Sequence, residues 1–178
     1  KEMIKNANFL GKFVIYGKNI FLKKLDYFGA RKCTKILAVS KEVQKRIKSC
    51  YGRESELFYV GVDPSKFKTG RYDNYVLSVG RLVWTKRPKT IVKAMNFVKN
   101  KKVKLIIVGA GDMEKEIEKI SKNNKSIEFK KYVSDKELKE LYANCLAVIS
   151  IPINEDMGYV PIEAVFSGKA TIGANEGG

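Results

Sequence analysis

The sequence contains no histidine and only three cysteines, Cys33, Cys50 and Cys145, whose spacing forms no pair. Without histidine, no serine or cysteine of this chain is activated by an imidazole, so a general base has to be a carboxylate or a lysine. Zinc sites and disulfide frameworks need clustered cysteine or histidine residues. We therefore expect no metal and no cofactor, and the unpaired cysteines indicate a reducing compartment.

Long apolar runs are also missing. The longest uninterrupted one covers residues 146–149 or little more, far fewer than the roughly 20 residues that cross a bilayer. Residues 1–8 are polar and mixed in charge, unlike a signal peptide. The first residue is lysine, and two glycines follow directly after a strand-like run, so we expect both ends to be cut from a longer protein.

Basic residues are in large excess: 35 Lys and Arg against 19 Asp and Glu give a net charge of +16. The excess is greatest in residues 1–60, where lysine dominates. Residues 18–28 have helical spacing, with Ile20, Phe21, Leu25 and Phe28 facing one way. A basic amphipathic helix fits an anionic membrane surface or a nucleic acid, and it equally fits a packed helix with a solvated basic face.

Strand-like and helical patterns alternate along the chain. Strands are predicted over residues 35–39, 57–60, 75–80, 103–109, 126–130, 145–151 and 170–173. Helices are predicted over 41–50, 88–99, 113–123, 134–144 and 159–167, with a capping box at Ser134 and Glu137. This alternation indicates an α/β fold with a Rossmann-like parallel sheet and helices on both faces. Ligands then bind beyond the carboxyl ends of the strands.

Two carboxylates, Glu155 and Glu163, flank the start of the last predicted helix. Gly158 marks the start of that helix, and Gly168 can end it in a left-handed conformation. The free N–H groups and the positive dipole end of the helix form an anion site between the two acids. A nucleoside diphosphate sugar fits this layout, although a solvated acid and a salt-bridged acid produce the same spacing.

Two cations follow a predicted strand at the same edge of the sheet. Arg81 comes directly after residues 75–80, and Lys86 stands five residues later. A guanidinium and an ammonium suit a diphosphate, but in so basic a chain each is also explained as a solvated surface cation. The run Gly109-Ala-Gly111 lacks the third glycine of a dinucleotide fingerprint, so a tight turn is favoured over NAD binding.

Together these motifs resemble the donor-binding half of a GT-B glycosyltransferase of family 4. The resemblance rests on residues 79–82 with Lys86, on residues 106–111 and 132–134, on Glu155 with Gly158 and Glu163, and on residues 167–168 and 176–178. Residues 36–40 and 59–67 are similar to the end of the acceptor domain and the crossing between domains. The implied division is 1–60 for the end of the N-terminal domain, 61–74 for the linker, and 75–178 for an incomplete C-terminal domain.

The resemblance implies a retaining transferase that moves a hexose, with GDP-mannose preferred over UDP-sugars, to a glycan or lipid-linked acceptor. The implied catalytic residues are Arg81 and Lys86 on the diphosphate and Glu155 on the transferred sugar. Glu163 is implied to bind the ribose and the backbone around Val133 the base. The remaining implied donor contacts are Gly80, Met157, Gly158, Tyr159 and Val160. No Asp-x-Asp metal motif is present, and a polysaccharide precursor is the expected acceptor class.

Two departures from the family pattern concern the site. Arg87 stands where glycine is common, and Asp156-Met157 replaces a more usual Pro-Phe. We expect a cytoplasmic enzyme, peripheral to the inner face of a membrane if the basic helix binds it, and no nucleic-acid partner. The competing hypotheses are a basic module that binds nucleic acid or anionic surfaces and an NAD-dependent Rossmann enzyme. The 178 residues alone are expected to bind donor weakly and to transfer nothing.

Overall fold

The computed structural model describes residues 9–177. The chain divides into two compact units, Lys1–Tyr59 and Val60–Gly178. We call them unit 1 and unit 2 and describe each by itself. The expectation that no signal peptide opens the chain concerns residues 1–8, which lie outside the described residues, as does Gly178 at the other end.

Unit 1 contains a long helix, α2 (Phe9–Lys32), and a small β-α-β element. The element consists of β1 (Leu37–Ala38), α3 (Lys41–Tyr51) and β2 (Glu56–Leu57), with the two short strands parallel. The hydroxyl of Ser40 accepts a hydrogen bond from the amide of Val43 and so caps α3 at its start. The guanidinium of Arg53, which follows α3, donates to carbonyls of Ala30 and Cys33 and so holds the end of α2 to this segment.

In the described part of unit 2, five parallel strands form one sheet in the order β5-β4-β3-β6-β7. Their bounds are β3 (Tyr75–Val79), β4 (Lys104–Val108), β5 (Ile127–Lys130), β6 (Ala147–Ser150) and β7 (Ala170–Gly173). The longer helices are α4 (Pro88–Ala94), α5 (Glu114–Lys122), α6 (Asp135–Asn144) and α7 (Tyr159–Phe166). Three short 3₁₀ turns complete the unit, η1 (Pro64–Lys66), η2 (Trp84–Lys86) and η3 (Met95–Phe97).

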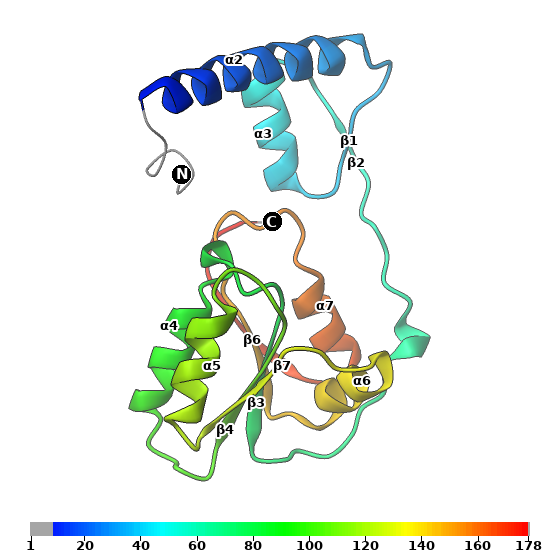
Figure 1. The fold of residues 1–178 in the computed structure, drawn as a ribbon. Coiled ribbons are helices and arrows are strands. Elements are labelled where there is room, and N and C mark those ends of the chain that lie inside the picture. Colours follow the sequence, from blue (N-terminus) through cyan, green and yellow to red (C-terminus); the bar gives the residue numbers. More distant parts are fainter. Residues whose placement is uncertain (1–8, 178) are drawn as a thin grey trace. The chain divides into compact units, whose positions relative to one another are not determined.

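The helices cover both faces of this sheet, α4 and α5 on one side and α6 and α7 on the other (Figure 1). The cluster on the first face joins Leu105 and Ile107 of β4 to Ile91 of α4 and Ile117 of α5. The cluster on the second face includes Leu77, Ile106, Val108, Tyr142, Cys145, Val148 and Ala164. Alternate residues of β4 therefore point to opposite cores, as a buried parallel strand requires. The predicted α/β, Rossmann-like architecture is confirmed.

The strands β3 and β6 diverge toward their carboxyl ends. β3 pairs with β4 through five residues, Tyr75 to Val79, but pairs with β6 only through Val76 and Leu77. The chain reverses its order along the sheet at this point, because β4 and β5 follow on one side of β3 and β6 and β7 on the other. Such a switch point is where open α/β sheets bind ligands.

Several element boundaries differ from the predicted ones, most clearly in one helix of unit 2 and in the strands of unit 1. The helix predicted over 88–99 ends at Ala94 and continues as the 3₁₀ turn η3, with Val98 already extended. In unit 1 the strand predicted over 35–39 is only Leu37–Ala38, and the one predicted over 57–60 is instead Glu56–Leu57, because only these residues are paired. The alternating pattern therefore located the elements, whereas hydrogen bonding set their ends.

The first segment of unit 2, before β3, packs onto the helices α6 and α7 of the same unit. Phe67 makes an edge-to-face contact with Tyr142, and its ring lies 6.3 Å from that of Phe166. The amides of Gly70 and Asp73 donate to the last carbonyls of α6, which would otherwise lack partners. Residues 61–74, predicted as a linker, are thus fixed against α6 and α7, while the assignment of whole domains stays a prediction.

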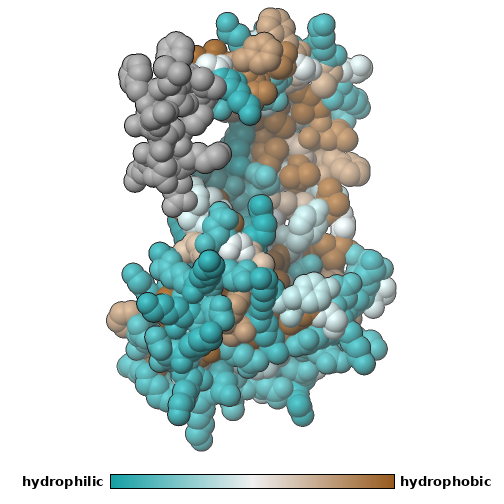
Figure 2. All heavy atoms as spheres, viewed as in Figure 1, coloured by the Kyte–Doolittle hydropathy of each residue, from teal (hydrophilic) through white to brown (hydrophobic). Residues whose placement is uncertain are grey.

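Apolar side chains are widely exposed on unit 1, where Figure 2 shows brown residues gathered over its helices. On α2 they are Tyr16, Ile20, Phe21, Leu22, Leu25, Tyr27 and Phe28. At about 100° per residue these positions cover more of the helix than the single face predicted from the sequence. Within residues 9–177, no helix combines the length and apolarity needed to span a bilayer.

Candidate functional site

The ammonium of Lys86 pairs with the carboxylate of Glu155 at the carboxyl ends of the strands. Lys86 closes the turn η2 after β3, and Glu155 lies in the loop after β6. The two loops are also joined through their backbones, because the amide of Ile153 donates to the carbonyl of Thr85 at 2.7 Å. Both side chains are about one-quarter to one-third exposed, 32% for Lys86 and 22% for Glu155. The pair is therefore open to a ligand at one side.

Arg81 lies at the rim of a small cavity between the diverging strands. The cavity has a volume of about 20 Å³ and is lined by residues 78–82, Lys86 and residues 149–152, among others. Arg81 itself is exposed and directly follows Gly80 at the end of β3. The structure thus brings Gly80, Arg81 and Lys86 to one place, as the sequence predicts.

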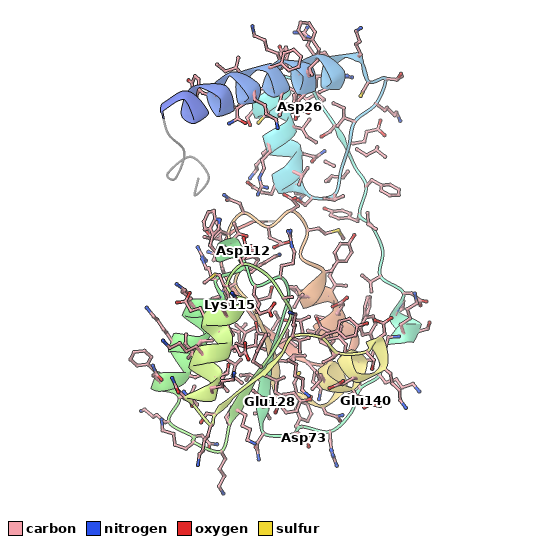
Figure 3. All side chains as sticks on the ribbon, viewed as in Figure 1. Asp26, Asp73, Asp112, Lys115, Glu128 and Glu140 are labelled. Atoms are coloured by element: carbon pink, nitrogen blue, oxygen red, sulfur yellow. The ribbon has the colours of Figure 1, made fainter. Side chains whose placement is uncertain are left out.

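Figure 3 labels a residue at each end of the sheet: Asp73, which precedes β3, and Asp112, which follows β4. The site lies at the end marked by Asp112. There the chains leaving β3 and β4 remain in close contact, and a side chain on Gly109 would reach within 1.9 Å of the Gly80 carbonyl oxygen. Gly109 therefore serves a tight approach between two strand ends, in agreement with the predicted tight turn.

The helix α7 begins immediately beyond Glu155. Gly158 is its N-cap, with a left-handed backbone (φ 74°) that favours glycine. The position of a Cβ on Gly158 lies 3.6 Å from Cγ of Glu155, so the acid and the helix start are neighbours. Met157 is half-buried and Tyr159 is exposed, while Val160 packs against the core. The start of α7 therefore neighbours the Lys86–Glu155 pair, and the amides of a first helical turn attract anions.

Glu163 lies one turn inside α7 and accepts a 2.7 Å hydrogen bond from the hydroxyl of Tyr142 on α6. Tyr142 is fully buried. Burial, followed by the hydrogen bond to Glu163, raises the pKa of the Tyr142 phenol well above its usual range. The tyrosine therefore stays protonated and donates to the carboxylate.

Both residues line an open groove with a volume of about 580 Å³. Its walls come from residues 61–63 and 66–67 and from Asp135, Leu138 and Lys139 of α6. The hydroxyl and amide of Ser65 hold the Asp63 carboxylate by hydrogen bonds and lower its pKa. The groove thus combines aromatic and apolar walls with several charged groups. Such a mixture of apolar surface and polar groups suits a ligand that has both, such as a nucleoside.

Val133, predicted to meet the base through its backbone, lies between β5 and α6. Its side chain packs on the core beside Leu138. The following residue, Ser134, caps α6 by accepting from the amide of Glu137. The carboxylate of Glu137 pairs with Lys130, the last residue of β5. These contacts fix the loop that carries Val133.

The departure at Arg87 has a structural counterpart. Arg87 has a left-handed backbone (φ 53°), the conformation that explains a preference for glycine. Its guanidinium pairs with Glu176, 2.5 Å away beyond β7, and donates to the carbonyl of Ile151 beyond β6. Sequence patterns did not indicate the Arg87–Glu176 pair or the role of Tyr142, because these partners are far apart in the chain.

In the part of the chain that the structure describes, no group of three or more His, Cys, Asp or Glu side chains is placed to hold a metal ion. The charged side chains around the switch point instead alternate in sign, Lys86 with Glu155 and Arg87 with Glu176.

Known proteins share the sequence pattern and the architecture of this chain. Residues 62–178, more than half of the chain, match the family model described as Glycosyl transferases group 1. The chain is 28% identical over 168 residues to the O-antigen chain mannosyltransferase RfbU of Salmonella typhimurium, covering 87% of this chain and 46% of that protein. This chain therefore spans about half the length of the curated relative it matches.

Solved structures agree in fold. The Anabaena protein Alr3699/HepE, in complex with UDP and glucose, superposes with a TM-score of 0.78 at 22% identity, covering 88% of this chain and 48% of that one. Sucrose-phosphate synthase from Thermosynechococcus elongatus gives a TM-score of 0.76 at 18% identity, covering 88% and 44%. The fold is that of GT-B glycosyltransferases. With the match over residues 62–178, this chain belongs to the glycosyl transferases group 1 family.

Proposed function

We propose that this chain forms the donor-binding part of a retaining glycosyltransferase, which moves a hexosyl group from a nucleoside diphosphate sugar to a glycan or lipid-linked acceptor. The observation that carries the proposal is the Lys86–Glu155 pair beside the start of α7, where β3 and β6 diverge. Cations, helix amides and a carboxylate meet there at the ligand-binding edge of the sheet.

The diphosphate occupies the space between Arg81, Lys86 and the first amides of α7. These groups neutralise the charge that develops on the departing nucleoside diphosphate, and because they are fixed before the reaction they need no reorganisation. Glu155 faces the transferred sugar, with Gly158 and its neighbours against the sugar and phosphate. In this proposal no metal ion is needed for the leaving group.

The nucleoside occupies the groove beneath α6 and α7. Glu163 accepts hydrogen bonds from the ribose hydroxyls, and the backbone around Val133 meets the base. The bond from Tyr142 supports this assignment, because it fixes the Glu163 carboxylate while leaving further acceptor positions on its oxygens. Glu163 and Glu155 thus serve different parts of one donor.

Transfer proceeds on one face of the sugar. The bond between the anomeric carbon and the phosphate oxygen breaks, the acceptor oxygen forms the new bond on the same side, and the hydroxyl proton passes to the departing phosphate. The configuration is retained, and in this proposal no protein group forms a covalent bond to the sugar. Electrostatic stabilisation supplies most of the rate.

We infer a mannosyl donor, GDP-mannose, ahead of UDP-sugars. The support is the 28% identity to a protein described as a mannosyltransferase. The solved neighbours with UDP share less than 25% identity and speak for the fold alone. UDP-glucose is therefore the competitor to test beside GDP-mannose.

A lipid-linked acceptor places the reaction at the inner, cytoplasmic face of a membrane. The lysines of α2, with the exposed apolar side chains beside them, support contact with an anionic surface. Sedimentation with vesicles of anionic phospholipid, compared with neutral vesicles and at high salt, tests this contact. Equal binding to both vesicle types contradicts it.

The donor assignment is tested by thermal unfolding of the full-length protein with GDP, UDP and their sugars. We expect at least one nucleotide to raise the unfolding temperature, and Arg81→Ala and Glu163→Ala each to abolish the rise. Lys101→Ala, which removes an exposed lysine from the turn before β4, is the matched control and keeps the rise. Protection that survives loss of Glu163, or salt-sensitive RNA binding without nucleotide protection, contradicts the proposal.

A further inference from the structure

Arg87 adopts an unfavourable backbone conformation at the edge of the donor site. Among the non-glycine residues that the structure describes, it shares a positive φ only with Asn154. Asparagine tolerates this region, whereas a long side chain is strained there. The position joins η2 to α4, and Arg87 is at once the C-cap of the first and the N-cap of the second. A side-chain interaction is needed to offset the strain.

The guanidinium supplies that interaction by joining three strand ends. Arg87 itself follows β3, its pair Glu176 follows β7, and its other acceptor, the carbonyl of Ile151, follows β6. The side chains of Arg87 and Glu176 are 31% and 40% exposed. The pair therefore lies at the surface of the site and not in the core. The fold tolerates a substitution at such a surface position.

The segment that contains Glu176 and Gly177 lies directly against Glu155. Gly177 also has a left-handed backbone (φ 94°), and a Cβ there would stand 2.9 Å from the amide nitrogen of Glu155. The neighbouring cation, Lys86, binds the Glu155 carboxylate itself. Two consecutive cations thus hold the two chain segments that meet beside the start of α7.

We propose that Arg87 is a positioning residue: through Glu176 it keeps the backbone of Gly177 against Glu155 and so sets the shape of the sugar side of the donor site. The inference rests on the proposed function of that site as a donor site. Arg87 acts through Glu176 and contacts no donor atom. Its loss leaves the nucleoside groove, with Glu163 and Tyr142, unchanged.

The chain offers variants that separate the side chain from the backbone. Arg87→Gly removes the guanidinium while fitting the positive φ without strain. Glu176→Gln removes the charge of the partner and keeps its shape. The two changes combined complete a double-mutant cycle. If the two side chains act through each other, the effect of the double variant does not exceed the larger effect of the single variants. Exchanged charges, Arg87→Glu with Glu176→Arg, test for rescue.

The first measurement needs no ligand. Hydrogen exchange of the full-length protein measures the exchange rates of the backbone amides of residues 175–177 and of Glu155. We expect Arg87→Gly and Glu176→Gln each to speed exchange there by about three- to tenfold, as the loss of a partly exposed ion pair allows, and the double variant to add nothing. Unchanged exchange in either single variant, or additive changes, overturns the proposal. If Arg87→Gly fails to fold, Glu176→Gln decides alone.

The second measurement separates sugar from nucleoside. Calorimetric titrations compare GDP with GDP-mannose and UDP with UDP-glucose. We expect both single variants to bind the nucleotide sugar about three- to tenfold more weakly while binding the bare nucleotide as before, and the exchanged charges to recover most of the loss. An equal loss for nucleotide and nucleotide sugar overturns the inference. If the unaltered protein binds none of the four ligands, the proposed function fails, and the exchange measurement still decides whether Arg87 holds Gly177.

Discussion

The buried hydroxyl of Tyr142 donates a 2.7 Å hydrogen bond to Oε2 of Glu163, across the interface between α6 and α7. The ring of Tyr142 is held from the side by Phe67. Because a carboxylate accepts several hydrogen bonds, this single bond orients Glu163 and leaves acceptor capacity toward the groove. The proposed binding of ribose hydroxyls by Glu163 requires a carboxylate that is held in this way.

We therefore expect Tyr142→Phe to weaken nucleotide binding by about tenfold, since a hydrogen bond to a charged group contributes about 1.5–3 kcal/mol and the reorientation of Glu163 forfeits part of it. Calorimetric titration with GDP and UDP measures the change. Tyr75→Phe is the matched control, because this half-buried hydroxyl donates to the Leu141 carbonyl instead of to a groove residue. Equal losses for the two variants would show a general packing effect.

The same two tyrosines predict a loss of stability at alkaline pH. Burial is the largest cause that raises the pKa of both phenols above the ordinary value of 10.0. Each hydroxyl therefore keeps its proton in the folded protein, whereas it ionises near pH 10 in the unfolded chain. The stabilisation is complete below pH 10 and falls above it, by about 1.4 kcal/mol per pH unit for each tyrosine until the folded-state pKa is reached.

Urea unfolding at pH 9 and pH 11 checks this sign. We expect the unaltered protein to lose more stability between the two pH values than Tyr142→Phe or Tyr75→Phe, because each variant lacks one ionisable phenol. A variant as pH-sensitive as the unaltered protein would show that its tyrosine ionises equally in both states.

Local patterns were sufficient to predict the sheet, its helices and the edge at which Lys86 and Glu155 meet. Gly158 and Gly168 bound α7 as predicted, because a left-handed cap is available chiefly to glycine. Pro88 opens α4, where its missing N–H has no partner to lose. Residues that follow different parallel strands meet at one edge, so the proximity of Lys86 and Glu155 followed from the fold class alone.

Contacts between distant residues could not be predicted in this way. Tyr142 precedes Glu163 by 21 residues and occupies an ordinary core position in the pattern of α6. Arg87 was visible as an unusual residue, yet its partner Glu176 depends on where β7 is added to the sheet. The wall that residues 61–67 give the groove was also missed, because a segment whose regular structure is one short 3₁₀ turn carries no periodic signal.

Removal of Lys86 tests its part in catalysis. We expect Lys86→Ala to lower kcat by about a hundred- to a thousandfold, the usual effect of losing one fixed group that stabilises charge in the transition state. Lys89→Ala is the matched control. Lys89 lies on α4, three residues after Lys86, and forms a half-exposed ion pair with Glu116 of α5. Its turnover stays within about twofold of the unaltered protein. A rise in donor KM with kcat unchanged would instead assign Lys86 to donor binding only.

Chelation tests the proposed charge neutralisation. If Arg81, Lys86 and the amides of α7 neutralise the diphosphate, turnover of the full-length protein with a nucleotide sugar is unchanged after treatment with EDTA. The measurement is an initial rate with chelator alone and with added Mg²⁺ or Mn²⁺. Activity that disappears with EDTA and returns with either ion would contradict a mechanism based on side-chain cations.

The close approach of β3 and β4 makes Gly109 more sensitive to substitution than Gly80. Both have nearly the same φ, 146° and 148°, so an alanine is strained to a similar degree at either position. A Cβ on Gly80 would meet nothing within 4 Å, whereas one on Gly109 would stand 1.9 Å from the Gly80 carbonyl oxygen. We expect Gly109→Ala to lower the free energy of unfolding by about 2–3 kcal/mol more than Gly80→Ala, as overpacking does. Denaturant unfolding of the two variants measures the difference. Because the strain is matched, that difference reports the steric term alone, and equal values would mean that the two strand ends separate freely at the edge where the donor is proposed to bind.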